Sequence, residues 1–495
     1  MDAKVAATLE EEWDAEADVV VLGAGAAGCA AAIEAHDAGA RVLVLEKLPH
    51  GKEGGNTRVS GGAWFHNRDP QRAAVYLRSL CAGYPLPEPV VRTWAEETAL
   101  NTQWMQERVG ARVAAVSAAI GDGGDSEIPP EFPELDGSDA YGGYRAVNGQ
   151  MGNAVLAETL LQAVKTRGIE VRPETPARSL VQDRDTGAVL GVVATEPSGH
   201  TLRVRAARGV VLATGGFEAN AEMVRDYLRL PDTLTWGNPA ATGDGHKMAQ
   251  KAGADLWHMD NMMTIEGLRV PGFSSGFYTR FSFAQGFIFV GLDGRRCINE
   301  LPQAGHGQAR IHGGYEHVPS RRLHVVFDEA TRVAGPISPR REMLPVGWNL
   351  LVEGYDWSAD NSVEIEKGWI HKAETIGELA NKLDVDPAVL TATVRRYNAD
   401  CEQGEDTQFG RPHRTLVPLR TPPYYGFTSA PMVGWSNGGP RRNENCQVLD
   451  PYGEVIKGLF AAGSVSSTYS WCKDGGMHIA DALAFGRVAG RAAAR

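Results

Sequence analysis

The apolar positions near the start of the chain come in short runs separated by a helical segment. Residues 18–22 form a run of mostly β-branched residues that ends at a glycine cluster, which is typical of a buried parallel strand. The alanine-rich segment 26–38 predicts a helix that stops at Gly39, and 41–46 predicts a second strand. We therefore expect a β-α-β unit of about 30 residues.

The same kinds of pattern return later in the chain, where apolar runs again end at glycine pairs. The expected elements are an amphipathic helix at 153–167 ending at Gly168, a hairpin of 177–183 and 189–196 turning at 185–187, an apolar strand at 209–214, a strand at 458–463 and a C-terminal helix at 475–493.

Residues 262–430 differ from both flanks because they contain more proline, arginine and tryptophan and show less regular patterning. Within them, Asp386 and Pro387 provide an N-cap and a first-turn proline for a helix that runs to about Cys401, before Gly404. We interpret 262–430 as an inserted α+β domain. It would interrupt an α/β domain formed by residues 14–261 and 431–495.

A dinucleotide-binding motif lies in the first β-α-β unit. Gly23, Gly25 and Gly28 follow the pattern G-x-G-x-x-G between the first strand and its helix. The first two glycines permit a tight turn against a pyrophosphate, the third allows close packing of helix on strand, and the helix N-terminus favours phosphate. Glu46, at the end of the second strand, is placed to accept a hydrogen bond from a ribose hydroxyl.

Three further glycine clusters favour FAD over a nicotinamide cofactor. Residues 54–62 follow the second strand, 213–217 end a distant strand, and 461–463 lead to Gly475 and Gly476. Such scattering along the chain is expected for an extended cofactor that runs through a whole domain.

The sequence resembles the flavoprotein family that includes fumarate reductase, succinate dehydrogenase and the 3-ketosteroid dehydrogenases, and its 3-ketosteroid dehydrogenase-like branch in particular. The resemblance implies a Rossmann-like, split FAD-binding domain with an inserted substrate-capping domain. The matching segments, in the family's order, are 23–28, 54–62, 213–217, 242–249, 298–300, 458–463, 475–476 and 484–490.

The resemblance also implies a set of residues in contact with FAD, and it aims the N-terminus of the last helix at the flavin. Because Asn56 stands where membrane-bound members carry a histidine linked to FAD, we expect the cofactor to be bound noncovalently. The expected cofactor-binding residues are Gly23, Gly25, Ala26, Ala27, Gly28, Glu46, Lys47, Gly54, Gly55, Asn56, Thr57, Ser60, Gly61, Gly62, Ala177, Ala213, Thr214, Gly215, Asn220, Asp244, Gly463, Ser464, His478 and Ile479.

The family adds or removes hydrogen across a C–C bond beside an electron-withdrawing group, and the sequence departs from its fumarate reductases. By resemblance, Ala304 stands at the position where the fumarate reductases carry a proton-donating arginine. Steroid dehydrogenases place a catalytic tyrosine at the same position. Trp435 replaces a substrate-binding histidine, and Lys473 replaces an arginine. A doubly charged substrate would lack partners, so we expect fumarate reduction to be disfavoured.

The resemblance to the steroid dehydrogenases includes one element of their ketone-binding site. Gly476 matches the glycine whose backbone N–H donates to the substrate ketone, while Cys472 stands in place of the partner tyrosine. Tyr469 or Trp471 could then supply the aromatic group near the ketone. Lys473 could bind a carboxylate on a small oxo-cyclohexanecarboxylate substrate, or it could instead be solvated or paired with Asp474.

The sequence leaves the proton-transfer residue open. His306 lies two residues after the vacant position at Ala304, and Tyr315 follows on the same segment together with His312. Tyr144, near Tyr141, is another candidate. For each of these residues the alternative is an ordinary role in packing or at the surface.

Composition and charge limit the ligands and the cellular location that we expect for this chain. Formal charge is −12 without a dense basic run, which argues against nucleic-acid binding, and six widely spaced cysteines exclude C-x-x-C metal and haem motifs, so no metal site is expected. The acidic start lacks the features of a signal peptide, and no apolar run approaches the roughly 20 residues of a membrane span. We expect a cytoplasmic protein that passes electrons to oxygen or a diffusible carrier.

The sequence thus predicts an FAD-dependent dehydrogenase that introduces an α,β double bond into a cyclic ketone, either a 3-ketosteroid or a small oxo-cyclohexanecarboxylate. Gly476 would polarise the ketone, and a base near 304–315 would take the α-proton. The alternatives are an FAD-dependent reductase of an activated alkene and a flavin-binding protein without turnover.

Overall fold

The computed structural model describes residues 13–116, 129–273, 275–282, 285–300, 308–311, 314–317, 322–342 and 354–495. His306, His312 and Ala304 therefore lie outside the described residues. Across the described ranges, no helix combines the length and apolar character that crossing a bilayer requires.

The first sheet is built around the predicted β-α-β unit. Strands β1 (Ala15–Leu22) and β2 (Val42–Leu45) are parallel, and β1 also pairs in parallel with β9 (Thr201–Leu212). The sheet order is β21-β22-β9-β1-β2-β6, with β7 and β8 forming the predicted hairpin beside β9. The remaining strands are β6 (Glu170–Arg172), β7 (Ala177–Gln182), β8 (Val189–Thr195), β21 (Gln447–Leu449) and β22 (Val455–Ala461).

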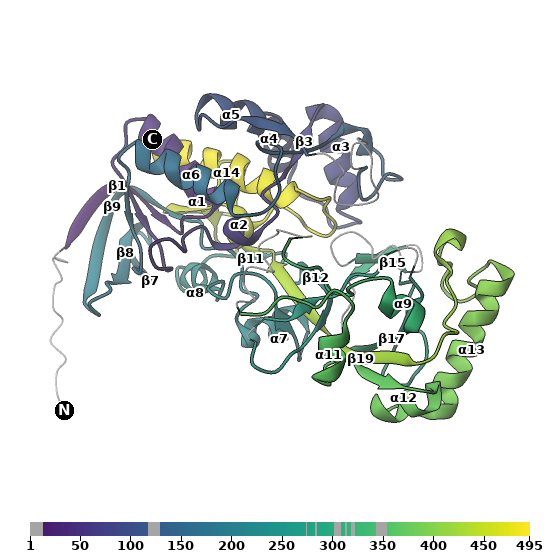
Figure 1. The fold of residues 1–495 in the computed structure, drawn as a ribbon. Coiled ribbons are helices and arrows are strands. Elements are labelled where there is room, and N and C mark those ends of the chain that lie inside the picture. The colour runs from purple at the N-terminus through teal and green to yellow at the C-terminus, as the bar shows by residue number, and fades with distance from the viewer. Residues whose placement is uncertain are drawn as a thin grey trace.

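Helices cover one face of this sheet. Helix α1 (Ala26–Asp37) packs along α14 (Met477–Ala493), and α6 (Val155–Thr166) lies beside them (Figure 1). Alternate residues of β1 enter different cores: Val19 and Val21 pack with these helices, whereas Val20 and Leu22 pack with β8 and the opposite face. Burial on both faces explains the continuous apolar run that predicted this strand.

Strand β9 is longer than predicted, since it begins at Thr201 rather than 209, and it ends two residues earlier than expected, at Leu212. Its first half alternates between exposed and buried residues and pairs antiparallel with β8, so only one face is covered there. Its last four residues are buried on both faces. The apolar run marks only this second part, which is why the first half escaped the prediction.

A second sheet contains most strands of the predicted insertion together with β10, which precedes residue 262, and it extends past residue 430 through β19, while β15 and β16 pair separately. Its order is β13-β12-β19-β17-β14, and β10 and β18 also pair with the long strand β19. Helix α13 (Pro387–Gln403) has Asp386 as its N-cap and Gly404 after its end, as predicted. The strands are β10 (Leu234–Thr235), β12 (Met262–Leu268), β13 (Phe277–Tyr278), β14 (Phe287–Val290), β17 (Leu323–Asp328), β18 (His371–Ala373) and β19 (Tyr424–Ser436).

Smaller elements complete the frame around the two sheets. A three-stranded sheet orders as β3-β5-β4, and β11 pairs with β20. The elements are β3 (Trp64–Asn67), β4 (Val113–Ala115), β5 (Tyr141–Val147), β11 (Leu256–Trp257), β15 (Gln308–Ile311), β16 (Gly314–His317), β20 (Gly439–Pro440), α2 (Gly55–Val59), α3 (Pro70–Leu80), α4 (Glu88–Ala99), α5 (Asn101–Glu107), α7 (Ala221–Leu228), α8 (Asp244–Lys251), α9 (Glu329–Val333), α11 (Ser362–Glu366) and α12 (Ile376–Lys382).

The matching segment 298–300 ends in a buried ionic cluster. Glu300 accepts hydrogen bonds from Arg296 Nε at 2.9 Å and Nη2 at 2.8 Å, and Arg296 also pairs with Asp406 at 2.8 Å. All three side chains are fully buried or nearly so. Breaking such a pair would leave a buried charge without compensation, so this cluster anchors the chain just before residue 301.

Candidate active site

The G-x-G-x-x-G motif folds as its spacing predicts. A Cβ added at Gly28 would lie 1.9 Å from Gly23 O, which shows how closely α1 packs on the loop after β1. Gly25 is the N-cap of α1 and has no side chain to cap it, but Thr57 Oγ1 accepts a hydrogen bond from Ala26 N at 2.9 Å. The other backbone N–H groups at the start of α1 adjoin the cavity, as a phosphate site requires.

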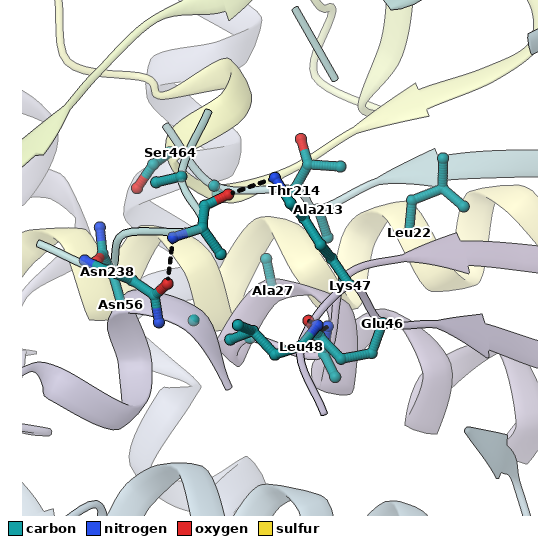
Figure 2. A pocket seen from close by; sticks show the side chains of 18 of the residues that line it. Leu22, Ala27, Glu46, Lys47, Leu48, Asn56, Ala213, Thr214, Asn238 and Ser464 are labelled. Carbon is teal, nitrogen blue, oxygen red and sulfur yellow. Dashed lines mark hydrogen bonds between the residues drawn. The ribbon is translucent and has the colours of Figure 1, made fainter. Parts of the chain in front are cut away.

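A cavity with about 940 Å³ of empty space opens at the carboxyl ends of β1, β2 and β9 (Figure 2). Seventeen predicted cofactor-binding residues line it. They are Gly23, Gly25, Ala26, Ala27, Glu46, Lys47, Gly54, Gly55, Asn56, Thr57, Ala177, Ala213, Thr214, Gly215, Asp244, Gly463 and Ser464.

Glu46 is held rigidly at the rim of this first cavity. Its two carboxylate oxygens accept hydrogen bonds from Ala24 N and Leu48 N, both at 2.8 Å. Burial raises the pKa of this carboxyl, while the backbone hydrogen bonds oppose the shift. A carboxylate fixed at the end of the second strand fits the ribose-binding role expected from the motif.

Lys47 links the end of β2 to the loop before α8. Its Nζ lies 3.0 Å from Asp244 Oδ2, 2.6 Å from Thr242 Oγ1 and 3.1 Å from the carbonyl oxygen of Ala240. These contacts fix one wall of the first cavity. The sequence indicated Lys47 and Asp244 separately, but only the fold joins them, across 197 positions of the chain.

A second cavity, also with about 940 Å³ of empty space, continues from the first and shares Asn56, Thr57, Ser464 and Ala482 with it. Five more predicted residues line only this second part: Ser60, Gly61, Gly62, His478 and Ile479. The two cavities together form an elongated space. Its residues and shape fit a dinucleotide whose two ends bind at opposite ends of the space.

The chemistry of the lining supports this fit. Thr214 Oγ1 is buried in the first cavity without a hydrogen-bond partner in the described part of the chain. A Cβ added at Gly215 would meet no atom within 4 Å, so the backbone there is open to a ligand. An orphaned polar atom beside an open backbone is expected where a polar ligand such as FAD binds.

Asn56 lies where the two cavities join, and a hydrogen-bond network fixes its side chain. Its Nδ2 donates to Glu218 Oε1 at 2.6 Å. Its Oδ1 accepts from Asn238 N, also at 2.6 Å (Figure 2). Glu218 in turn accepts from Ser436 Oγ at 2.8 Å and Ser436 N at 3.1 Å. The network ties α2 to the end of β19.

The far end of the second cavity is formed by the start of α14. Gly476 is the N-cap of this helix, with φ +73°, and a Cβ there would lie 2.5 Å from Phe65 N. Gly476 has no side chain with which to cap this helix end. Only glycine fits this backbone, so the predicted carbonyl-binding N–H sits at an open helix N-terminus.

Lys473 and Asp474, next to this helix end, are both buried. The Lys473 Nζ lies 4.7 Å from the ring centroid of Trp435, and burial lowers the pKa of Lys473 to about 7. Lys473 is 3% exposed, so it is not the solvated lysine that the sequence left open. Burial and the nearby Glu131 raise the pKa of Asp474 to about 8.

Other predicted residues lie away from the cavities. Tyr469 Oη donates to Met477 O at 2.6 Å and accepts from Trp94 Nε1 at 3.1 Å, which gives this buried tyrosine a structural role. Tyr315 bonds to Glu134 and packs against Phe132. Gly28 and Asn220 support the site from behind: Gly28 through helix packing and Asn220 as the N-cap of α7.

Sequence reasoning missed several lining residues. Some lie inside or next to segments that the sequence analysis recognised, so that position was the available signal, and they are Leu22, Ala24, Leu45, Leu48, Ala63, Thr242, Met248, Ala462 and Asp474. The others lie outside every recognised motif, and they are Met151, Pro176, Asn238, Ala240, Ala241, Gly434 and Ala482.

Comparisons with known proteins agree with this site. Residues 18–483 match the family described as FAD binding domain. NADH:fumarate oxidoreductase of Klebsiella pneumoniae (strain 342) is 30% identical over 493 residues, which cover 97% of this chain and 48% of that protein. The chain thus spans about half the length of this relative. The 3-oxosteroid 1-dehydrogenase of Mycobacterium tuberculosis (strain ATCC 25618 / H37Rv) is 27% identical over 583 residues, covering 96% of this chain and 97% of that protein.

The fold has a close counterpart among solved structures. The 3-ketosteroid delta1-dehydrogenase from Sterolibacterium denitrificans superposes with a TM-score of 0.79 at 23% identity, covering 97% of this chain and 99% of that one. This likeness confirms the expected fold class, and the family match confirms FAD as the cofactor. The chain therefore belongs to the FAD-binding family of oxidoreductases that includes fumarate reductases and 3-ketosteroid dehydrogenases.

Proposed function

We propose that this protein is a dehydrogenase that introduces an α,β double bond into a cyclic ketone. The observation that carries the proposal is the composition of the second cavity. Its described lining contains the open N-terminus of α14 at Gly476 but neither arginine nor lysine. A neutral carbonyl finds a donor there, whereas a dicarboxylate such as fumarate would be buried without an arginine or lysine partner.

The chain's own residues would divide the work as follows. Gly476 N–H, supported by the dipole of α14, would hold the ketone oxygen and stabilise the negative charge that develops on it as the α-proton leaves. Trp435 and Met151 would exclude water from the ring. FAD, when bound along 54–62 and the end of α14, supplies an acceptor for the β-hydride.

The placement of Lys473 bears on substrate class. Lys473 is not among the described lining residues of the second cavity. It packs against the ring of Trp435, which does line the cavity. This supports a ketone without a carboxylate over an oxo-cyclohexanecarboxylate. The likeness to 3-oxosteroid 1-dehydrogenase points in the same direction.

Reduction of an activated alkene is the second candidate, favoured by the similarity to NADH:fumarate oxidoreductase. Anaerobic mixing of purified holoprotein with cyclic ketones, with and without a carboxylate, distinguishes the two. Loss of the oxidised-flavin absorbance with a ketone would support the dehydrogenase. No loss with any ketone, together with reoxidation of reduced enzyme by fumarate or an enone, would replace it with the reductase.

A further inference from the structure

One corner of the second cavity, next to Gly476, gathers two carboxyl groups and two tyrosines. Asp474 and Tyr144 line the cavity, and Tyr76 and Glu131 contact Asp474 from behind. These residues come from the loop before α14, from β5, from α3 and from the segment after residue 128. Only the fold brings them together. None of them belongs to the motifs that predicted the FAD site.

Asp474 is the centre of this cluster. Its Oδ2 accepts hydrogen bonds from Tyr76 Oη at 2.7 Å and Glu131 N at 3.1 Å, and its Oδ1 accepts from Gly475 N at 2.6 Å. The side chain is 1% exposed. A carboxyl so placed can hold or release a proton without moving, since its donors fix it in position.

Tyr144 connects this carboxyl pair to the substrate space. A Cβ added at Gly475 would lie 1.7 Å from Tyr144 Oη and 2.9 Å from Glu131 Oε1, so both oxygens lie beside the backbone of Gly475. The neighbouring residue is Gly476, whose N–H is the proposed ketone donor. Tyr144 and Gly476 therefore line the same end of the second cavity.

We propose that Tyr144 exchanges the proton on the carbon beside the ketone and that the Glu131–Asp474 carboxyl pair takes up or supplies the proton of its hydroxyl. The inference rests on the proposed function and names the proton-transfer group that the sequence left open. It assigns this role to Tyr144 in preference to Tyr315, which is not among the described lining residues of the second cavity.

The step balances as follows. In dehydrogenation the Cα–H bond breaks and its proton binds Tyr144 Oη, while the Tyr144 O–H bond breaks and that proton passes to a carboxylate oxygen of Glu131. The electrons of the Cα–H bond form the C=C bond as the β-hydride leaves to oxidised flavin. In alkene reduction the same protons move in reverse, so the relay serves either direction.

The relay explains why a buried tyrosine can act here. Burial and the charges of Glu131 and Asp474 raise the pKa of Tyr144 well above its usual value, so a free phenolate is disfavoured. Simultaneous transfer to a carboxylate avoids that charge. The other groups that face the cluster are Tyr141, which hydrogen-bonds to Tyr144 and packs edge-on against it, and Lys473, whose pKa the charge of Glu131 raises against the larger effect of burial.

The test compares Tyr144→Phe and Glu131→Gln with wild type, using Tyr452→Phe, a hydroxyl deletion at a residue that is 91% exposed, as the matched control. With a ketone that bleaches the flavin, Tyr144→Phe is expected to slow flavin reduction about 100-fold or more at unchanged FAD content, and Tyr452→Phe less than twofold. A Tyr144→Phe rate within threefold of wild type overturns the relay.

If no ketone bleaches wild-type flavin, the proposed dehydrogenase fails but the relay is still tested. Reduced enzyme is then mixed with an enone in D₂O, and Tyr144→Phe should lose α-deuteration of the product.

A measurement without substrate gives an independent readout. Infrared difference spectra between pH 6 and pH 9 should show a protonated carboxyl band in wild type that Asp474→Asn removes. Absence of this band from wild type at pH 6 would also overturn the relay.

Discussion

Replacing Asn56 with alanine tests whether the junction between the two cavities stabilises the fold. The change removes the hydrogen bond to the buried Glu218 carboxyl and the one from Asn238 N, both 2.6 Å long. A hydrogen bond to a charged group contributes about 1.5–3 kcal/mol and a neutral one about 1 kcal/mol. Glu218 is 2% exposed and keeps its two bonds from Ser436, so we expect a loss of about 3 kcal/mol in unfolding free energy.

The assay is urea unfolding of the apoprotein, followed by circular dichroism, with Asn381→Ala as the control. Asn381 lies exposed on α12, where alanine is a better helix former, so this variant should stay within about 0.5 kcal/mol of wild type. Water entering the cavity could replace one bond and reduce the Asn56→Ala effect to about 1.5 kcal/mol. An effect below about 0.5 kcal/mol would refute the view that this network supports the junction.

Three further predictions follow from the site. Gly28→Ala would force a Cβ to 1.9 Å from Gly23 O, so the loop must move and the purified protein should contain little FAD by absorbance; a full complement of FAD would contradict the packing argument. FAD should be released completely by heat or acid precipitation, because Asn56 offers no covalent link, and flavin retained in the pellet would show otherwise. Because burial raises the pKa of Asp474 from 3.8 to about 8, the folded state keeps a proton that the unfolded chain releases, and stability should fall as pH rises between these values. Asp474→Asn should flatten that fall in urea unfolding across the pH series, and an unchanged slope would disprove the shift.

The chain's local patterns were sufficient to predict most of the segments that line the two cavities. Glycine spacing, an apolar strand and a helix start are set by backbone sterics and by burial on both faces, which act over a few residues. The structure accordingly places 23–28, 54–62 and 213–215 around one elongated space. The ends of α13 were predictable for the same reason, since Asp386, Pro387 and Gly404 act on their own backbone.

Contacts between distant segments were decided only by the tertiary structure. Asn56 meets Glu218 across 162 positions, and Asp474 meets the backbone of Glu131 across 343. Sequence spacing carries no information about such pairs. The charge state of a buried group depends on these neighbours, which is why the sequence left Lys473 and the proton-transfer residue open. Burial of Lys473 against Trp435, and the convergence of Tyr144 and Glu131 at Gly475, exist only once the strands and helices have packed.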